Sequence, residues 1–231
     1  QSGRRQRQMC IRDSICSVSV NNDREFLHFH EALPRQHSEK LLGIISDLIN
    51  QVNLTFKDLD SIAVAVGPGS YTGLRLSCAI AQGLAYAQKI DVVSLSSLEL
   101  LSLEAHEKTG FDEIISLSSS NQGKVYTAKS RFIEGDVDTE FLLLDENELK
   151  NKIFKQNSKF VGQGCELLQV QNILPNAEPK ASLLMKIAQL RFRKGKTIKP
   201  EFASPMYFND EDSWKKTVSY THLRAHETYR D

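Results

Sequence analysis

The feature that most restricts the fold is a glycine-rich turn that follows a short apolar run and precedes a helix of small residues. The apolar run, residues 60–66 (DSIAVAV), is typical of a strand that is covered on both faces. The turn at residues 67–69 (GPG) ends this strand, and Ser70 or Thr72 can cap the helix that follows, because a hydroxyl accepts a bond from an unpaired first-turn amide. Strands that alternate with helices predict an α/β fold.

The same alternation continues on both sides of the turn. Between Ser38 and Val52 the apolar residues recur at three- and four-residue spacing, which predicts an amphipathic helix. The other predicted elements are a hairpin of strands at 15–20 and 25–30, a strand at 92–95, a helix from about 96, strands at 113–117, 124–131, 141–144 and 159–161, and helices at 146–152 and 181–193. We see no low-complexity linker between them, so we expect two lobes that share an interface.

The two ends of the chain do not share the pattern of the sequence between them. Residues 1–14 are basic and aperiodic, and residues 218–231 are unrelated in pattern to what precedes them. We expect both to be foreign or disordered segments and exclude them from reasoning about the fold. The remainder is expected to divide into an N-terminal lobe at 15–104 and a C-terminal lobe with a closing segment at 105–217.

Composition argues against several classes of function. Lysine plus arginine and aspartate plus glutamate number 29 each, so no net charge draws the chain to nucleic acid or to an anionic membrane. The 4 cysteines are scattered without the spacing of a zinc site, which indicates free thiols in a reducing compartment. No apolar run approaches the roughly 20 residues that span a bilayer. We therefore expect a cytoplasmic protein.

The sequence argues against a nucleotide-binding loop, an acid pair and a serine nucleophile. A Walker loop needs a lysine that is absent between Gly67 and Gln88, and a dinucleotide fingerprint needs a different glycine spacing. Asp58 and Asp60 lie in a turn, where aspartate commonly caps or solvates. Ser70 has no histidine and third orienting group in a recognisable pattern. We predict no catalytic residues, no metal site and no cofactor site in this chain.

The helix after the turn carries two rows of small residues, which allow another helix to approach closely. The members of the rows are Gly73, Ser77, Ala81 and Ala85, and, beside them, Ala79, Gly83 and Ala87. One row is expected to pack on the chain's own sheet. The presence of two rows indicates a helical partner.

Residues 67–87, GPGSYTGLRLSCAIAQGLAYA, resemble the signature of the TsaB (YeaZ) family, whose usual form is GPGSFTGLRIG followed by an A-x-GLA helix. The matching loop comprises Gly67, Pro68, Gly69, Ser70, Tyr71, Thr72, Gly73, Leu74 and Arg75. Further segments that resemble the family follow in order: CSVSV (16–20), LPRQHSEKLL (33–42), SLSSLELL (94–101) and PMYFNDEDSWKK (205–216). The resemblance therefore covers about Ile15 to Lys216.

The sequence departs from the family at three places. Residues 1–14 replace the Ile-Asp-Thr type of turn with which the family's first strand begins. Residues 119–126 read SSNQGKVY where the family usually has DAR-x-x-EVY, and Asn209 stands where arginine is common. If the family's charged residues serve its complex, this chain has lost part of their contribution.

The resemblance implies an actin/Hsp70-like (ASKHA) fold of two ribonuclease-H-like lobes, with mixed sheets flanked by helices. It implies a non-catalytic subunit that binds and stabilises TsaD for threonylcarbamoyl transfer to adenosine 37 of tRNAs reading ANN codons. The residues expected to pack against TsaD are Leu41, Ile45, Leu48, Gly73, Ser77 and Ala81.

On this interpretation, ATP and metal belong to the partner subunits, a TsaE-like ATPase docks across the pair, and tRNA is met only through the complex. A homodimer is expected when the partner is absent. Two alternatives stay open: an independent enzyme of the same superfamily, peptidase-like or kinase-like, and a self-associating scaffold.

Overall fold

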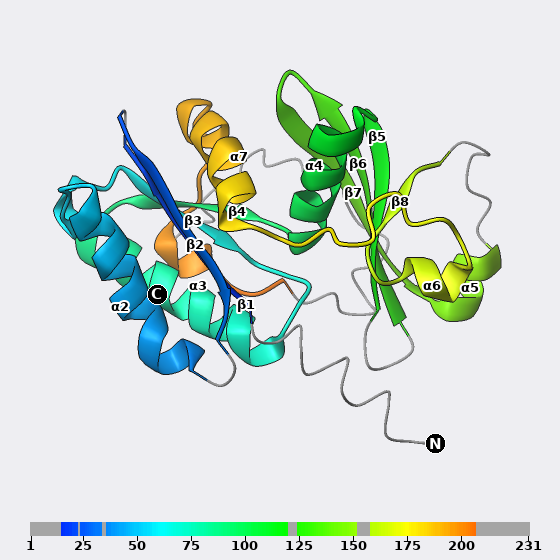
Figure 1. Ribbon diagram of the computed structural model, residues 1–231, viewed down its shortest axis with the longest axis horizontal. Coiled ribbons are helices and arrows are strands. Elements are labelled where there is room, and N and C mark those ends of the chain that lie inside the picture. Colours follow the sequence, from blue (N-terminus) through cyan, green and yellow to red (C-terminus); the bar gives the residue numbers. More distant parts are fainter. Residues whose placement is uncertain (1–14, 23, 34–35, 120–123, 152–157, 207–231) are drawn as a thin grey trace, which may run out of the picture.

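The computed structural model describes residues 15–22, 24–33, 36–119, 124–151 and 158–206, and it forms two lobes side by side (Figure 1). The first lobe holds two strand pairs, and the second a four-stranded sheet in the order β7-β6-β5-β8. The strands are β1 (Ile15–Asn21), β2 (Phe26–Ala32), β3 (Ser61–Ala65), β4 (Asp91–Leu95), β5 (Glu113–Ser119), β6 (Lys124–Ile133), β7 (Asp136–Asp145) and β8 (Phe160–Val161). The predicted α/β class, with sheets flanked by helices, is confirmed.

Helices cover both faces of the first-lobe strands. The helices of the chain are α2 (His37–Gln51), α3 (Tyr71–Gln88), α4 (Ser97–Thr109), α5 (Glu146–Asn151), α6 (Cys165–Leu168) and α7 (Ala181–Arg193), with short 3-10 turns η1 (Phe56–Asp58) and η2 (Pro200–Phe202). Leu48 and Ile49 of α2 pack with Val20 of β1. Helix α3 packs on one face of β3 and β4, while α7 packs on the other. The near-continuous apolar run of β3 follows from this double cover.

Helix α7 ties the first lobe together. Strands β1 and β2 are antiparallel, β3 and β4 are parallel, and the described strands of this lobe show no pairing between the two sets. Helix α7 contacts both sets, and the amide of Ala181 donates to the Ser17 hydroxyl at 2.9 Å. The chain beyond α7 then pairs with β4 through Val92 and Ile198. The first lobe is therefore completed by residues that come late in the sequence.

This late return corrects the expected division of the chain at residues 104 and 105. That boundary falls inside α4, and α7 together with Ile198 packs on the first lobe although both lie in the segment 105–217. The reason is burial: the exposed face of the β3–β4 pair needs an apolar cover, which α7 supplies with Leu184 and Ile187. The lobes are therefore not two consecutive stretches of sequence.

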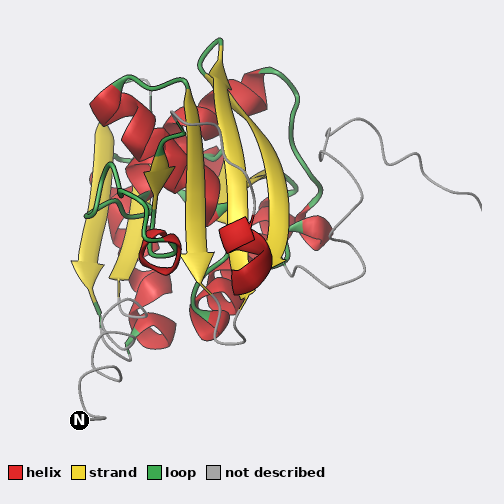
Figure 2. Ribbon diagram, turned by 90° about the vertical axis from the view of Figure 1, so that its right-hand side faces the viewer, coloured by secondary structure: helices red, strands yellow, loops and turns green. Residues whose placement is uncertain are grey.

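The second-lobe sheet is also covered on two sides. Leu98, Leu101 and Ala105 of α4 pack on one face, and α5 and α6 lie over part of the other. Figure 2 views the molecule from the right-hand side of Figure 1, where the strands of this sheet run next to one another. The predicted strand at 141–144 is longer than expected, because β7 pairs with β6 along its whole length from Asp136 to Asp145. Helix α6 was not predicted.

Local signals in the sequence set several boundaries correctly. Helix α3 begins directly after Ser70, and α7 covers 181–193 as predicted. Residues 120–123 between the predicted strands at 113–117 and 124–131, residue 152 and most of the closing motif at 205–216, with Asn209, lie outside the described residues. The same holds for both ends that we expect to be foreign or disordered, 1–14 and 218–231. Within the described residues, no helix is long and apolar enough to cross a membrane.

Candidate functional site

The turn after β3 is anchored on the start of α4. Gly67 has φ +116°, a conformation that L side chains rarely adopt, and a Cβ there would lie 3.0 Å from Leu74 Cδ1. Its carbonyl oxygen accepts bonds from the Ser96 hydroxyl at 2.8 Å and from the Ser97 amide at 2.7 Å. Glycine is therefore required at this position, and the turn is fixed relative to α4.

The next residues of the signature form the first turns of α3. Ser70 is the N-cap, and its hydroxyl accepts a bond from the Gly73 amide at 3.3 Å. Tyr71 and Thr72 are exposed, and the Arg75 guanidinium lies 3.8 Å from the centroid of the Tyr71 ring. The Ser70 hydroxyl thus serves the helix as a cap, which is one of the two caps that the sequence offers.

Replacing Ser70 by alanine is expected to destabilise the chain by about 1 kcal/mol, the usual value of an N-cap hydroxyl. Urea denaturation followed by circular dichroism measures this loss. Ser70→Thr, which keeps the hydroxyl, is the control and should retain most of the stability. An alanine variant as stable as the parent would show that the cap contributes nothing to α3.

The structure corrects part of the predicted interface. Leu41, Leu48 and Ala81 are 8%, 7% and 4% exposed, respectively, so they are not available to a partner. Ala81 packs with Cys78 and Ala85 against β3 and β4, because this row of α3 is the one that faces the sheet.

The other three predicted interface residues are half-buried, and their role stays a prediction. They are Ile45, Gly73 and Ser77. A Cβ on Gly73 would lie 3.3 Å from the Ser70 Cβ, so a bulky substitution at Gly73 would disturb the helix cap as well as any interface. Gly73 is therefore a poor position at which to test pairing alone.

The neighbouring row of small residues on α3 is open to solvent. Ala79 is exposed, Tyr86 is 77% exposed, and a Cβ on Gly83 would meet no atom within 4 Å. Helix α2 contacts α3 and brings two further apolar or small residues to the surface, Leu42, which is 49% exposed, and Gly43, where a Cβ would also meet no atom within 4 Å. We call these five residues the α2–α3 face. Sequence reasoning found the Ala79–Gly83 row but placed the interface on its neighbour.

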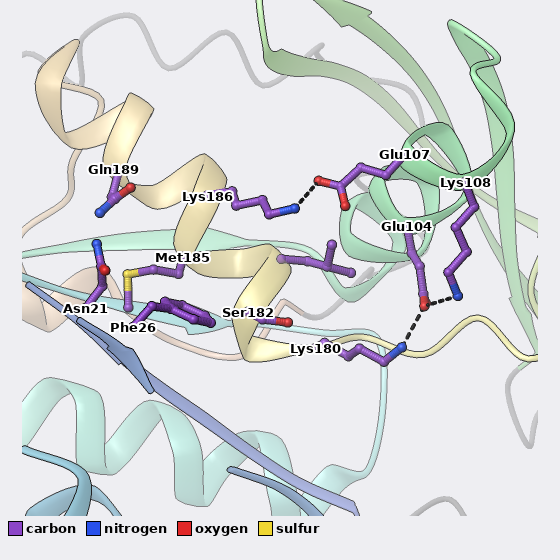
Figure 3. A pocket seen from close by; sticks show the side chains of 11 residues that line it. Asn21, Phe26, Glu104, Glu107, Lys108, Lys180, Ser182, Met185, Lys186 and Gln189 are labelled. Atoms are coloured by element: carbon purple, nitrogen blue, oxygen red, sulfur yellow. Dashed lines mark hydrogen bonds and ion pairs between the residues drawn. The ribbon is translucent and has the colours of Figure 1, made fainter. Parts of the chain in front are cut away.

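A cavity of about 470 Å³ lies between α4, α7 and the end of the β1–β2 hairpin (Figure 3). Its charges are paired: Lys108 and Lys180 both donate to Glu104 Oε1, at 2.9 and 2.6 Å, and Lys186 donates to Glu107 at 2.7 Å. Burial tends to raise the pKa of Glu104, but bonds from Lys180, the Glu178 amide and Lys108 outweigh it and hold the pKa below its usual value. Glu104 therefore stays ionised at neutral pH and is unsuited to act as a general acid.

The described cysteines and acids complete this chemical inventory. Cys16, Cys78 and Cys165 are free and buried, and burial raises the pKa of Cys78 and of Cys165 to about 11, so their thiols are poor nucleophiles at neutral pH. Asp58 accepts bonds from the Thr55 amide and hydroxyl, which confirms a capping role. Within the described residues, no group of three or more metal-ligating side chains converges.

Comparison with known proteins shows similarity to TsaB proteins over most of the chain. A family model described as "TsaD: tRNA N6-adenosine threonylcarbamoyltransferase" matches residues 31–141. A protein of Escherichia coli K12 named "tRNA threonylcarbamoyladenosine biosynthesis protein TsaB" is 29% identical, over 87% of this chain and 93% of its own length. Over most of its length the chain is similar to proteins of the TsaB (YeaZ) family. A Haemophilus influenzae protein of the same name is 25% identical over 87% of the chain and 92% of its own length.

The likeness to the transferase itself is partial. A tRNA N6-adenosine threonylcarbamoyltransferase of Pelodictyon phaeoclathratiforme is 32% identical, but over only 37% of this chain and 25% of its own length. The solved structure of YeaZ from Pseudomonas aeruginosa superposes with a TM-score of 0.73 at 23% identity, over 84% of this chain and 95% of that one. The chain therefore resembles the transferases over one segment and shares its overall fold with YeaZ.

Proposed function

We propose that the chain is a non-catalytic subunit that binds a TsaD-like enzyme and supports threonylcarbamoyl transfer to adenosine 37 of tRNA. The observation that carries the proposal is the α2–α3 face, a set of exposed small and apolar residues on two contacting helices, in a chain that is similar to TsaB proteins over most of their length. Small residues let a partner helix approach closely, and Leu42 and Tyr86 can act as apolar anchors at its edges. The face therefore suits helix-on-helix packing with a partner.

The chemistry of the described residues supports an accessory role. Glu104 and Glu107, which line the cavity between α4 and α7, are paired with lysines. The described cysteine thiols are buried. On this proposal the TsaD-like partner and a TsaE-like ATPase supply the ATP and metal sites, and tRNA contacts the assembly rather than this chain. The same face can pair with a second copy when the partner is absent.

The proposal is tested by reconstitution of the modification reaction. The full chain, a TsaD-like protein from the same source, a TsaE-like ATPase and the enzyme that forms threonylcarbamoyl adenylate are combined with unmodified tRNA. We expect modified adenosine only when this chain is present, and no product from the chain alone. Equal product formation without the chain, or tight ATP binding and turnover by the isolated chain, would favour an independent enzyme instead.

A further inference from the structure

A buried ionic cluster joins three elements at the junction of the lobes. Arg191 of α7 donates to Glu99 Oε1 of α4 at 3.0 Å and to Asp136 Oδ1 at the start of β7 at 3.1 Å. It also donates to the Val137 carbonyl at 3.1 Å, and Lys196 closes the cluster on Asp136 Oδ2 at 2.8 Å. The side chains of Arg191, Glu99 and Asp136 are 6%, 8% and 9% exposed. These geometrically matched bonds fix α4, α7 and β7 relative to one another.

The hydrogen-bond network extends from Glu99 to the glycine turn at Gly67. Glu99 uses its second oxygen, Oε2, to accept a bond from the Ser96 amide at 2.6 Å, and Ser96 is fully buried. The Ser96 hydroxyl donates to the carbonyl of Gly67 at 2.8 Å, and the Ser97 amide donates to the same carbonyl at 2.7 Å. A continuous chain of hydrogen bonds therefore runs from β7 of the second lobe, through α7 and α4, to the turn that starts α3.

The end of this chain of bonds lies directly beside the first turn of α3. Gly67 packs against Leu74, and the Ser70 cap holds the Gly73 amide, so a shift at Gly67 moves the first turn of α3. The exposed row at Ala79 and Gly83 lies on the same helix, and a helix moves largely as a rigid rod. The network whose other end is in the second lobe therefore reaches the helix that carries Ala79, Gly83 and Tyr86 of the α2–α3 face.

We propose that Ser96 and Glu99 are positioning residues that set the glycine turn, and with it α3, for partner binding. This inference rests on the proposed function, because it assigns a role in presenting the same face. Neither residue belongs to that face. They act through Gly67 and link the arrangement of the two lobes to the surface offered to the partner.

The test compares two serine-to-alanine changes, one at the N-cap of α4 and one inside that helix. Ser96→Ala removes the bond to Gly67 and also the N-cap bond that the same hydroxyl accepts from the Leu98 amide at 3.1 Å. Ser102→Ala removes a buried hydroxyl that has no partner among the described atoms and serves as the control. Hydrogen exchange of the Gly73 and Leu74 amides is measured on the isolated chain, and the affinity for the TsaD-like protein is measured by calorimetry. We expect Ser96→Ala to accelerate the exchange and to weaken binding by about fivefold or more each, with both unchanged in Ser102→Ala.

A second variant covers the case in which Ser96→Ala fails to fold. Glu99→Gln keeps the side-chain volume and an oxygen for the Ser96 amide but removes the charge that meets Arg191, and it should shift the same two readouts in the same direction. Unchanged exchange at Gly73 and Leu74 in the folded variants would overturn the positioning role. Absence of any complex with the parent chain would instead defeat the proposed function, and the exchange data on the isolated chain would still decide this inference.

Discussion

Gly83→Arg is expected to weaken binding to the TsaD-like partner by about 100-fold, roughly 3 kcal/mol, while the chain remains folded. A Cβ at Gly83 meets no atom within 4 Å, so the new side chain projects into solvent in the isolated chain. Replacing a mid-helix glycine by arginine should even stabilise α3 by roughly 0.5–1 kcal/mol. In the complex the same side chain would hold two helices apart and bury a charge without a partner. Calorimetry gives the affinity, and urea denaturation gives the stability.

Two control variants make this result specific. Ile133→Arg places the same side chain at a 52% exposed apolar position on the second lobe and should leave binding unchanged. Ala81→Leu enlarges a residue that packs on the chain's own strands and should cost about 1–3 kcal/mol of folding stability. If Gly83→Arg bound the partner as tightly as the parent, the α2–α3 face would be excluded as the interface.

Arg191→Met is expected to lower the free energy of unfolding by about 3–5 kcal/mol at neutral pH. The change leaves Glu99 and Asp136 buried without their shared cation. Lys186→Met, on the same helix, is the matched control: Lys186 is 60% exposed and pairs with a partly exposed Glu107, so its loss should cost below about 1 kcal/mol. Urea denaturation of both variants measures the difference, and equal losses would contradict a special role for the buried cluster.

The stability deficit of Arg191→Met should also depend on pH. Burial raises the pKa of Glu99 although Arg191 opposes the effect, whereas for Asp136 bonds from Lys196 and Arg191 outweigh burial and hold the pKa below its usual value. Removing Arg191 raises both folded-state values, so the variant binds more protons when folded than the parent does. The deficit should therefore be larger at neutral pH and shrink as the pH falls through the raised folded-state pKa values of these carboxyls. A deficit that is constant with pH would show that lost packing, not lost charge, explains the effect.

Sequence predicted best where short-range chemistry decides the structure. The sequence offers Ser70 and Thr72 as caps of α3, and the structure shows that Ser70 is the one used. The apolar spacing of 181–193 predicts α7, which covers those residues. Which small-residue row of α3 faces the sheet could not be read from the sequence, since both rows offer similar volumes. The structure decides through the packing of Ala81 and Ala85 on β3 and β4, which leaves Gly83 outside.

The buried cluster was missed because its members are far apart in the sequence. Arg191 and Glu99 are separated by 92 positions, and neither lies in a recognised motif. One signal was present: Arg191 falls on the apolar face of α7, at helical spacing from Leu184 and Ile187. A charged residue on a buried helical face implies a buried partner, although the identity of the partner depends on the tertiary fold.

The most direct test of the account is a calorimetric titration of the full chain with a TsaD-like protein from the same source. We expect a saturable complex that Gly83→Arg weakens by about 100-fold and that Ile133→Arg leaves intact. A titration that shows no binding by the parent chain, together with tight binding of ATP to that chain alone, would contradict it.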